Sequence, residues 1–312
     1  MSIAYTDVSV RGRIRKLPSI DVADSRVVVN RGWLRRAQVF DEYWLPAVSL
    51  PDPLTVLDQC RAMRPKPDIF TFAQRVPHLE PRYRFPFSWD NVAVIALSSF
   101  DAWLTKQVTP ATRRNIKSAE KKGVTVRAVD YDDAYVRGIM SIYNETPIRQ
   151  GRRFWHYGKP FEAVQAENGT YADRSTFLAA YLNSEMIGYL KMVWDAETAA
   201  VMQIMSQVGH YDTRPNNALL AEAVRQCCAR GTKYLLYESF VYGKKEQNSL
   251  TEFKRSNGFV RMDVPRYYVP LTWKGHAAVR LGLHTSLKER LPAWMATAWV
   301  DARTRWYRLT AR

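Results

Sequence analysis

The chain has 312 residues, of which 46% are hydrophobic and 12% aromatic, which suits a folded protein of one large domain or two lobes. Its 46 basic and 30 acidic residues give a net charge of +16, which favours an anionic partner such as a nucleotide cofactor, tRNA, an acidic glycan or an anionic membrane surface. There is no uncharged apolar run of about 18 residues, no signal-peptide core, and the three cysteines match neither a disulfide framework nor a zinc site. We therefore expect a cytoplasmic protein that binds no metal.

The first part of the chain predicts a small lobe with few long elements. Residues 35–44 are interpreted as a helix, because their apolar side chains gather on one side at helical spacing. Eight prolines between residues 46 and 86 exclude long regular elements there, except for a short helix at 54–63. Short strands are predicted at 4–10, 26–29, 69–74 and 92–97.

A basic helix is predicted at 112–122, and Gly123 is expected to end it. At helical spacing, Arg114, Lys117 and Lys121 share one face of this helix. The face is either an ordinary solvated surface or an electrostatic guide for an anionic acceptor or tRNA.

The segment 144–161 is unusually rich in large amphipathic side chains. Aromatic rings alternate there with cationic side chains, a combination suited to recognition of a phosphate, a sugar or a base. Packing between two lobes would also explain this composition. The candidate acceptor-binding residues are Arg149, Arg152, Trp155, His156 and Tyr157.

The central feature of the sequence is a strand, a polar loop and a helix between residues 199 and 230. The helix has a continuous apolar face and stops before Gly231, a residue suited to the left-handed position beyond a helix C-terminus. A strand that leads into a helix N-terminus creates an anion site, because the first amides of the helix are unpaired. An acyltransferase needs this arrangement for a donor that carries a diphosphate. Strands at 176–182, 186–193, 232–243 and 260–271 and a helix at 248–256 are predicted around it.

Three stretches carry a resemblance to a known family. TRRNIKSAEKKGV (112–124), ETPIRQGRRFWHYGK (145–159) and YGKKEQNSLTEFKRSNGF (242–259) are similar to the FemAB-related branch of the GNAT-like acyltransferases. This branch includes aminoacyl-tRNA-dependent enzymes that build peptide bridges and acetyltransferase-like proteins associated with polysaccharide synthesis. The resemblance covers roughly residues 90–272.

The resemblance implies an α+β GNAT-like N-acyltransferase fold in three parts. We expect a reduced N-terminal lobe at 1–130, an acyltransferase core at 131–272 and a basic helical tail at 273–312. Two amphipathic helices, 274–291 and 292–307, are predicted in the tail. They either cap the core or lie against an anionic membrane, so the protein is expected in the cytoplasm or peripherally at the inner membrane face.

The donor site departs from the family pattern. GNAT enzymes usually hold the CoA diphosphate with Arg/Gln-x-x-Gly-x-Gly/Ala, which aligns with residues 214–219. Arg214 matches, but Asn217 and Leu219 replace the small residues, and Pro215 has no amide hydrogen. Acyl-CoA, such as acetyl-CoA, is therefore one candidate donor and aminoacyl-tRNA the other. The candidate cofactor-binding residues are Gln207, Val208, Gly209, Arg214, Asn216 and Asn217.

The candidate catalytic residue is Lys254. It stands four residues before Gly258, where many GNAT enzymes have a tyrosine, and the resemblance implies that its ammonium neutralises charge developing on the reacting carbonyl. Glu238 and Tyr242, near the end of the preceding strand, are candidates for proton transfer. An exposed helix lysine is the alternative for Lys254, and structural roles are the alternative for the other two.

The expected function is direct transfer of an acyl group from acyl-CoA to an amine or hydroxyl of a small-molecule, peptide, sugar or natural-product acceptor. Two alternatives are kept. One is aminoacyl transfer from tRNA, and the other is a non-catalytic GNAT-fold protein that binds an anionic glycan or a membrane through its tail.

Overall fold

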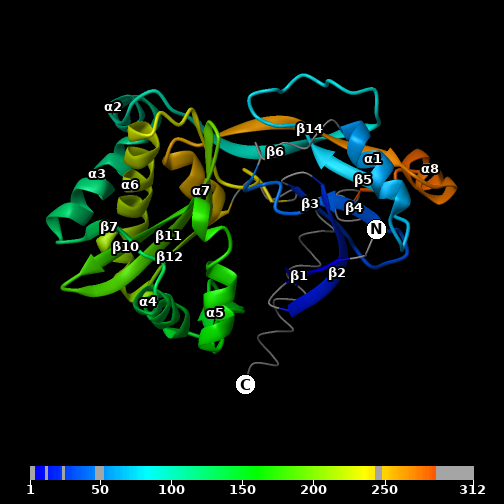
Figure 1. Ribbon diagram of the computed structural model, residues 1–312. Coiled ribbons are helices and arrows are strands. Elements are labelled where there is room, and N and C mark those ends of the chain that lie inside the picture. The colour runs from blue at the N-terminus through cyan, green and yellow to red at the C-terminus, as the bar shows by residue number, and fades with distance from the viewer. Residues whose placement is uncertain (1–3, 11–12, 23–24, 46–52, 243–247, 286–312) are drawn as a thin grey trace.

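The computed structural model describes residues 4–10, 13–22, 25–45, 53–242 and 248–285. One twelve-stranded sheet runs through both lobes, in the order β1-β2-β3-β4-β5-β14-β6-β13-β12-β11-β10-β7 (Figure 1). The described chain is mixed α and β, as predicted. Its strands are β1 (Ala4–Val10), β2 (Arg13–Val22), β3 (Ser25–Val29), β4 (Arg36–Val39), β5 (Ile69–Ala73), β6 (Phe87–Ala96), β7 (Thr125–Val129), β10 (Ser175–Leu182), β11 (Glu185–Asp195), β12 (Thr198–Ser206), β13 (Tyr234–Leu236) and β14 (Val260–Pro270).

The helices lie on both faces of this sheet, and a small separate hairpin projects from the second lobe. The hairpin consists of β8 (Ile148–Arg149) and β9 (Arg152–Arg153). The longer helices are α1 (Pro53–Ala62), α3 (Pro110–Lys121), α4 (Asp133–Asn144), α5 (Phe161–Asn168), α6 (Pro215–Ala229), α7 (Ser249–Ser256) and α8 (Trp273–Arg280). Short turns of helix are α2 (Phe100–Ala102), a π-helical turn η1 (Trp103–Gln107), and the 3₁₀ turns η2 (Ala172–Arg174) and η3 (Val208–Thr213).

The first lobe has an apolar core between one face of its strands and α1. Phe70 and Phe72 of β5 and Val39 of β4 belong to this core. The helix predicted at 35–44 is wrong, because Arg36–Val39 is β4, which pairs with β3 and β5. Ala37 and Val39 are buried and Gln38 between them is exposed, so the period is that of a strand, and sheet pairing overrides the helical spacing of the downstream aromatics.

Two long strands carry the sheet from one lobe into the other. β14 pairs with β5 through residues 266–270 and with β6 through residues 260–267, and β6 in turn pairs with β13. β6 begins at Phe87, earlier than predicted, because its first residues pair with the far end of β14. β14, which was predicted as a strand of the acyltransferase core, therefore also belongs to the sheet of the first lobe.

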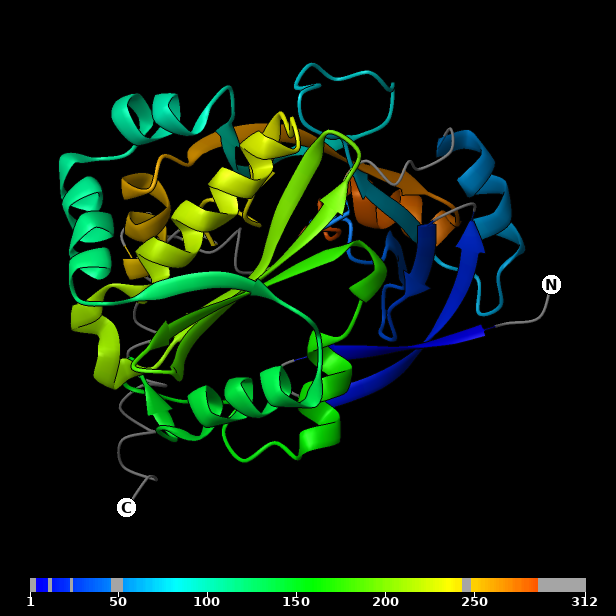
Figure 2. The ribbon, with the colours of Figure 1, turned by 60° about the vertical axis from the view of Figure 1, so that its left-hand side comes forward.

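The second lobe places helices on both faces of a meander formed by β10, β11 and β12. Leu190 of β11 packs toward α6 in one core cluster, whereas Tyr189 packs toward α4 in another. Figure 2 shows α3 and α6 on one side of these strands and α4 and α5 on the other. In the structure α3 packs against α6 and β7 pairs with β10, so residues 110–129 lie with the second lobe.

The two lobes also meet away from the shared sheet. Tyr171 Oη, from the second lobe, donates to Asp41 Oδ2 of the first lobe at 2.7 Å. Burial raises the pKa of Asp41 to about 6, and the Tyr171 hydrogen bond opposes this rise. The contact ties the loop after β4 to the segment before β10.

The C-terminal region is described only as far as residue 285. The first predicted tail helix is observed as α8, which ends at Arg280 and packs against β14. The second, at 292–307, lies outside the described residues. No helix within the described ranges is long and apolar enough to cross a membrane.

Candidate functional site

The site forms where two parallel strands separate. β12 and β13 pair only through Thr198–Ala200 and Tyr234–Leu236. β12 continues to Ser206, whereas the chain after β13 pairs with β6 instead, through a bond from the amide of Tyr237 to the oxygen of Ala93 (2.9 Å). The predicted strand at 232–243 is thus only three residues long, because the chain turns away from β12 after Leu236. Diverging strands leave backbone groups of β12 available at this end of the sheet.

Lys254 lies in α7 with its side chain fully buried. Its Nζ donates to the backbone oxygen of Ser239 (2.8 Å) and to Oη of Tyr242 (3.3 Å). Nζ also lies 4.2 Å from the centroid of the Tyr237 ring, a cation–π contact. Burial lowers the pKa of Lys254 to about 8, and the Glu238 carboxylate opposes this change. Lys254 is therefore not the exposed helix lysine that the sequence left as an alternative.

Tyr242 and Glu238 lie beside the lysine. Tyr242 Oη donates to the carboxylate of Glu238, and burial, followed by the Glu238 charge, raises the pKa of the phenol. Glu238 has a φ of 46°, in the left-handed region that few residues other than glycine adopt. The structure thus brings Lys254, Tyr242 and Glu238 into one hydrogen-bonded group, hereafter the Lys254 cluster.

Side-chain hydrogen bonds hold both ends of α7. Asn248 caps the N-terminus by accepting from the amide of Thr251 at 2.9 Å. At the other end, the indole of Trp103 donates to the oxygen of Asn257 (3.0 Å), and Gly258 adopts a φ of 88°. A Cβ at Gly258 would lie 3.1 Å from Cβ of Gln107, so the close approach of η1 also favours glycine. These contacts fix the position of Lys254 on the helix.

The N-terminus of α6 offers few free amides. Arg214, at the position before the helix, is exposed and has a φ of 60°. Pro215 has no amide hydrogen, and the amides of Asn217 and Ala218 donate to the oxygen of Arg214 at 3.1 and 3.3 Å. The amide of Asn216 is the one left to this first turn, which makes a poor cradle for a diphosphate.

Asn217 connects two helices. Its side chain is buried and donates to Oδ1 of Asn257, at the end of α7, at 3.2 Å. The bond joins the first turn of α6 to the end of α7, the helix that carries Lys254.

The end of β12 is occupied by a carboxylate from the same chain. The amides of Val208 and Gly209 donate to the two carboxylate oxygens of Glu145, at 2.6 and 2.7 Å. Gln207, the residue before them, donates its side-chain amide to Glu185 at 3.0 Å. Both amides that the sequence assigned to a cofactor therefore already bind an anionic group.

Glu145 was not predicted as a site residue. It follows α4 and lies 63 residues before Val208 in the sequence, so only tertiary packing brings it to β12. Its place in the stretch 145–159 that carried the family resemblance is the one sequence signal that marks it.

Arg149 holds Glu145 and the end of β12 together. Its side chain is 10% exposed and pairs with Glu145 at 3.2 Å. It also donates to the backbone oxygens of Ser206 (3.1 Å) and Ile142 (2.6 Å). Its Nε–H is buried and has no partner among the described residues, while both Nη atoms are engaged. Arg149 is therefore mainly a structural contact within the fold.

The other predicted acceptor-binding residues separate into two groups. His156 is 5% exposed, its ring centroid lies 4.3 Å from that of Tyr143, and burial lowers its pKa to about 3. Arg152, Trp155 and Tyr157 are exposed on the surface around the β8–β9 hairpin. An external ligand can therefore reach these last three side chains, whereas Arg149 and His156 are packed inside.

The arrangement is suited to stabilising a negative oxygen. A fixed ammonium beside a hydroxyl and a carboxylate supplies both an electrostatic partner and a proton relay. Among the described residues, no group of histidine, cysteine, aspartate and glutamate side chains could hold a metal ion.

Comparisons with known proteins agree with this architecture. No known family model and no curated protein matches the sequence. The C-terminal domain of a putative lysylphosphatidylglycerol synthetase from Agrobacterium fabrum is similar in structure, with a TM-score of 0.54 and 10% identity over 82% of this chain and 84% of that one. FemX is similar with a TM-score of 0.53 and 11% identity, over 85% of this chain and 87% of its own.

A conserved protein of unknown function from Bacteroides thetaiotaomicron also matches, with a TM-score of 0.51 and 13% identity over 81% of this chain and 85% of that chain. At these identities the likeness concerns the fold. The predicted α+β fold is confirmed, and it is similar to the fold of FemX.

Proposed function

We propose that this protein transfers an acyl group directly to an amine or hydroxyl of an acceptor, with Lys254 stabilising the oxyanion of the transition state. The observation that carries the proposal is the buried Lys254 ammonium, hydrogen-bonded to Tyr242 and to the backbone of Ser239 in the segment that follows β13. The acceptor nitrogen or oxygen attacks the acyl carbon, and its proton passes through Tyr242 to Glu238. The bond from the acyl carbon to the donor's oxygen or sulfur then breaks, and the departing atom takes this proton back through Tyr242, so that the donor leaves as an alcohol or thiol. Lys254 balances the charge on the carbonyl oxygen during this step.

Aminoacyl-tRNA is the donor that we favour. The amides of Val208 and Gly209 are occupied by Glu145, and Asn217 is committed to Asn257, so a CoA diphosphate would find few free donors at this loop. The net charge of +16 and the exposed basic face of α3 would attract a polyanion such as tRNA. The similar domain from Agrobacterium fabrum belongs to a putative lysylphosphatidylglycerol synthetase, which is named for an aminoacylated lipid, and this name is consistent with aminoacyl transfer.

Acyl-CoA remains the second candidate. The separation of β12 from β13 exposes strand backbone, and Arg214 is free to approach a phosphate. The acceptor would then be a small molecule, peptide or sugar. In either case the basic segment 273–312 is a proposed contact with nucleic acid or an anionic membrane.

Two titrations separate these candidates. We expect charged tRNA to bind with an affinity that falls steeply with salt, because many phosphates are neutralised. We expect no calorimetric signal from CoA or acetyl-CoA up to millimolar concentrations. Micromolar binding of acetyl-CoA, about −8 kcal/mol, would make acyl-CoA the donor instead.

The matched variant is Glu145→Ala, which removes the carboxylate from the two amides. If Glu145 excludes CoA, this variant gains affinity for CoA while wild type does not. The acyl-transfer proposal itself fails if the protein binds neither charged tRNA nor acetyl-CoA and releases the acyl group from neither of them.

A further inference from the structure

A cavity lies in the first lobe, on the sheet face opposite α1. Its volume is about 430 Å³, within the range of ligand pockets, roughly 300–1,000 Å³. Side chains at neighbouring positions of paired strands point the same way, so Thr71 of β5 shares this face with its partners, Gln38 of β4 and Tyr268 of β14. Phe70 and Phe72 point to the other face, into the core under α1.

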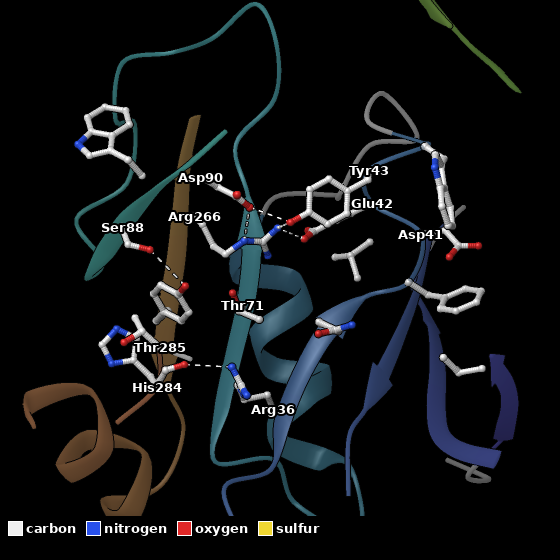
Figure 3. A pocket seen from close by; sticks show the side chains of 17 residues that line it. Arg36, Asp41, Glu42, Tyr43, Thr71, Ser88, Asp90, Arg266, His284 and Thr285 are labelled. Carbon is white, nitrogen blue, oxygen red and sulfur yellow. Dashed lines mark hydrogen bonds and ion pairs between the residues drawn. The ribbon is translucent and has the colours of Figure 1, made fainter. Parts of the chain in front are cut away.

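The acidic side chains of this cavity already have partners. Arg266 forms ion pairs with Glu42 and with Asp90, the latter at 2.9 Å. Tyr43 Oη donates to the same Asp90 carboxylate at 2.9 Å (Figure 3). The carboxylates of Glu42 and Asp90 are therefore paired with Arg266, and this part of the cavity wall offers no vacant site for a cation.

Three donor groups in the cavity have no partner among the described residues. Thr71 is 5% exposed, and its buried Oγ1 makes no hydrogen bond. Arg36 donates through Nη1 to the oxygen of His284 (3.0 Å), but its buried Nε–H is unused, and so is the indole Nε1–H of Trp44. Figure 3 shows Thr71 on the cavity floor between Arg266 and Arg36. Buried donors are rarely left without an acceptor, because an unmade hydrogen bond is costly.

We propose that this cavity binds a small molecule through a carboxylate or phosphate group that accepts hydrogen bonds from Arg36 Nε and Thr71 Oγ1. The unused groups are donors and one of them is cationic, so the matching ligand group is anionic and rich in acceptors. Tyr43 and Tyr268 supply aromatic surface for the rest of the ligand. The site does not depend on the chemistry of Lys254.

A smaller neighbouring cavity extends from this one toward the region between the two lobes. A smaller cavity shares Glu42, Tyr43 and Asp90 with it and reaches Leu236, the last residue of β13. The two cavities together extend from Arg36 to the strand end from which the chain continues to Glu238.

The test is an NMR titration of the full chain that follows the Nε–H signals of its arginines. Inorganic phosphate and, separately, acetate are added at constant ionic strength, and the Arg36 signal is identified by its loss in Arg36→Gln. We expect this signal to move with saturation and its exchange with water to slow. Movement with phosphate alone assigns a phosphate ligand, and movement with acetate alone assigns a carboxylate.

Arg61 is the control within the same spectra, because it is exposed on α1 and its side chain pairs with Asp58. Its signal is expected to stay in place. The matched variant Thr71→Val keeps the shape of the side chain and removes the hydroxyl, so anion binding should weaken about tenfold. The proposal is overturned if neither anion moves the Arg36 signal, if Arg36 and Arg61 respond alike, or if Thr71→Val binds as tightly as wild type.

Discussion

Replacing Lys254 by methionine separates a catalytic role from a structural one. Methionine has a similar length and fills the same space, but it carries no charge and makes no hydrogen bond to Ser239 or Tyr242. If the ammonium stabilises an oxyanion, turnover should fall by roughly 10²–10³, or about 3–4 kcal/mol of transition-state stabilisation.

Stability should respond in the opposite sense. The pKa of Lys254 is lowered from 10.5 to about 8, so keeping it charged in the folded protein at neutral pH costs roughly 3 kcal/mol. Removing the charge relieves this cost and offsets the lost hydrogen bonds. We therefore expect Lys254→Met to unfold at a denaturant concentration equal to or above that of wild type.

The pH dependence gives an independent check. A lysine whose folded pKa is lowered destabilises the protein below that pKa, and the penalty is relieved as the pH rises from about 8 to 10.5. Wild type should gain stability over this window relative to Lys254→Met, while its turnover falls above pH 8 as the ammonium loses its proton.

The assay is release of the acyl group from whichever donor binds, measured beside urea unfolding of both proteins. Full turnover in Lys254→Met would refute the oxyanion role. A turnover loss matched by loss of folded protein at the assay temperature would mean that the lysine acts on stability alone.

Three further changes test the surrounding structure. Arg149→Ala should lower the free energy of unfolding by about 3 kcal/mol, because a buried arginine with several hydrogen bonds is removed; an unchanged urea midpoint would return Arg149 to acceptor binding. Asn217→Ala should cost about 1 kcal/mol and also reduce turnover, since it disconnects α6 from α7; normal turnover in the folded variant would contradict this coupling. The pKa of Asp41 is about 6 in the folded protein and 3.8 in the unfolded chain, so the folded state holds one more proton between these values. Wild type should therefore lose about 3 kcal/mol of stability as the pH rises from 4 to 6. Asp41→Asn should lack this loss. If the stability of both proteins changes with pH in the same way, folding does not raise the pKa of Asp41.

Local sequence signals predicted the elements that carry the site. Gly231 follows the end of α6, as the sequence predicted, and the helix predicted at 248–256 is observed as α7, Ser249–Ser256. These features depend on backbone conformation within a few residues, so they are readable from the chain alone. The spacing between Lys254 and Gly258 marked the helix that carries Lys254.

Sequence reasoning failed where the partner of a segment is distant. Residues 36–39 form a strand because β3 and β5 lie on either side of it, which a helical spacing of apolar residues does not reveal. The same limit applies to β14, whose pairing with β5 joins residues near 270 to residues near 70. Register and pairing are properties of the assembled sheet.

The sequence by itself determined the chemistry that is present: a lysine before Gly-Phe, a strand that leads into a helix, and a strongly basic chain. The tertiary structure alone decided which groups are available to a ligand. Lys254 is buried beside Tyr242, Glu145 occupies the amides after β12, and Arg149 is enclosed by backbone oxygens. The physical reason is that burial and hydrogen-bond satisfaction depend on neighbours brought together only when the two lobes fold around one sheet.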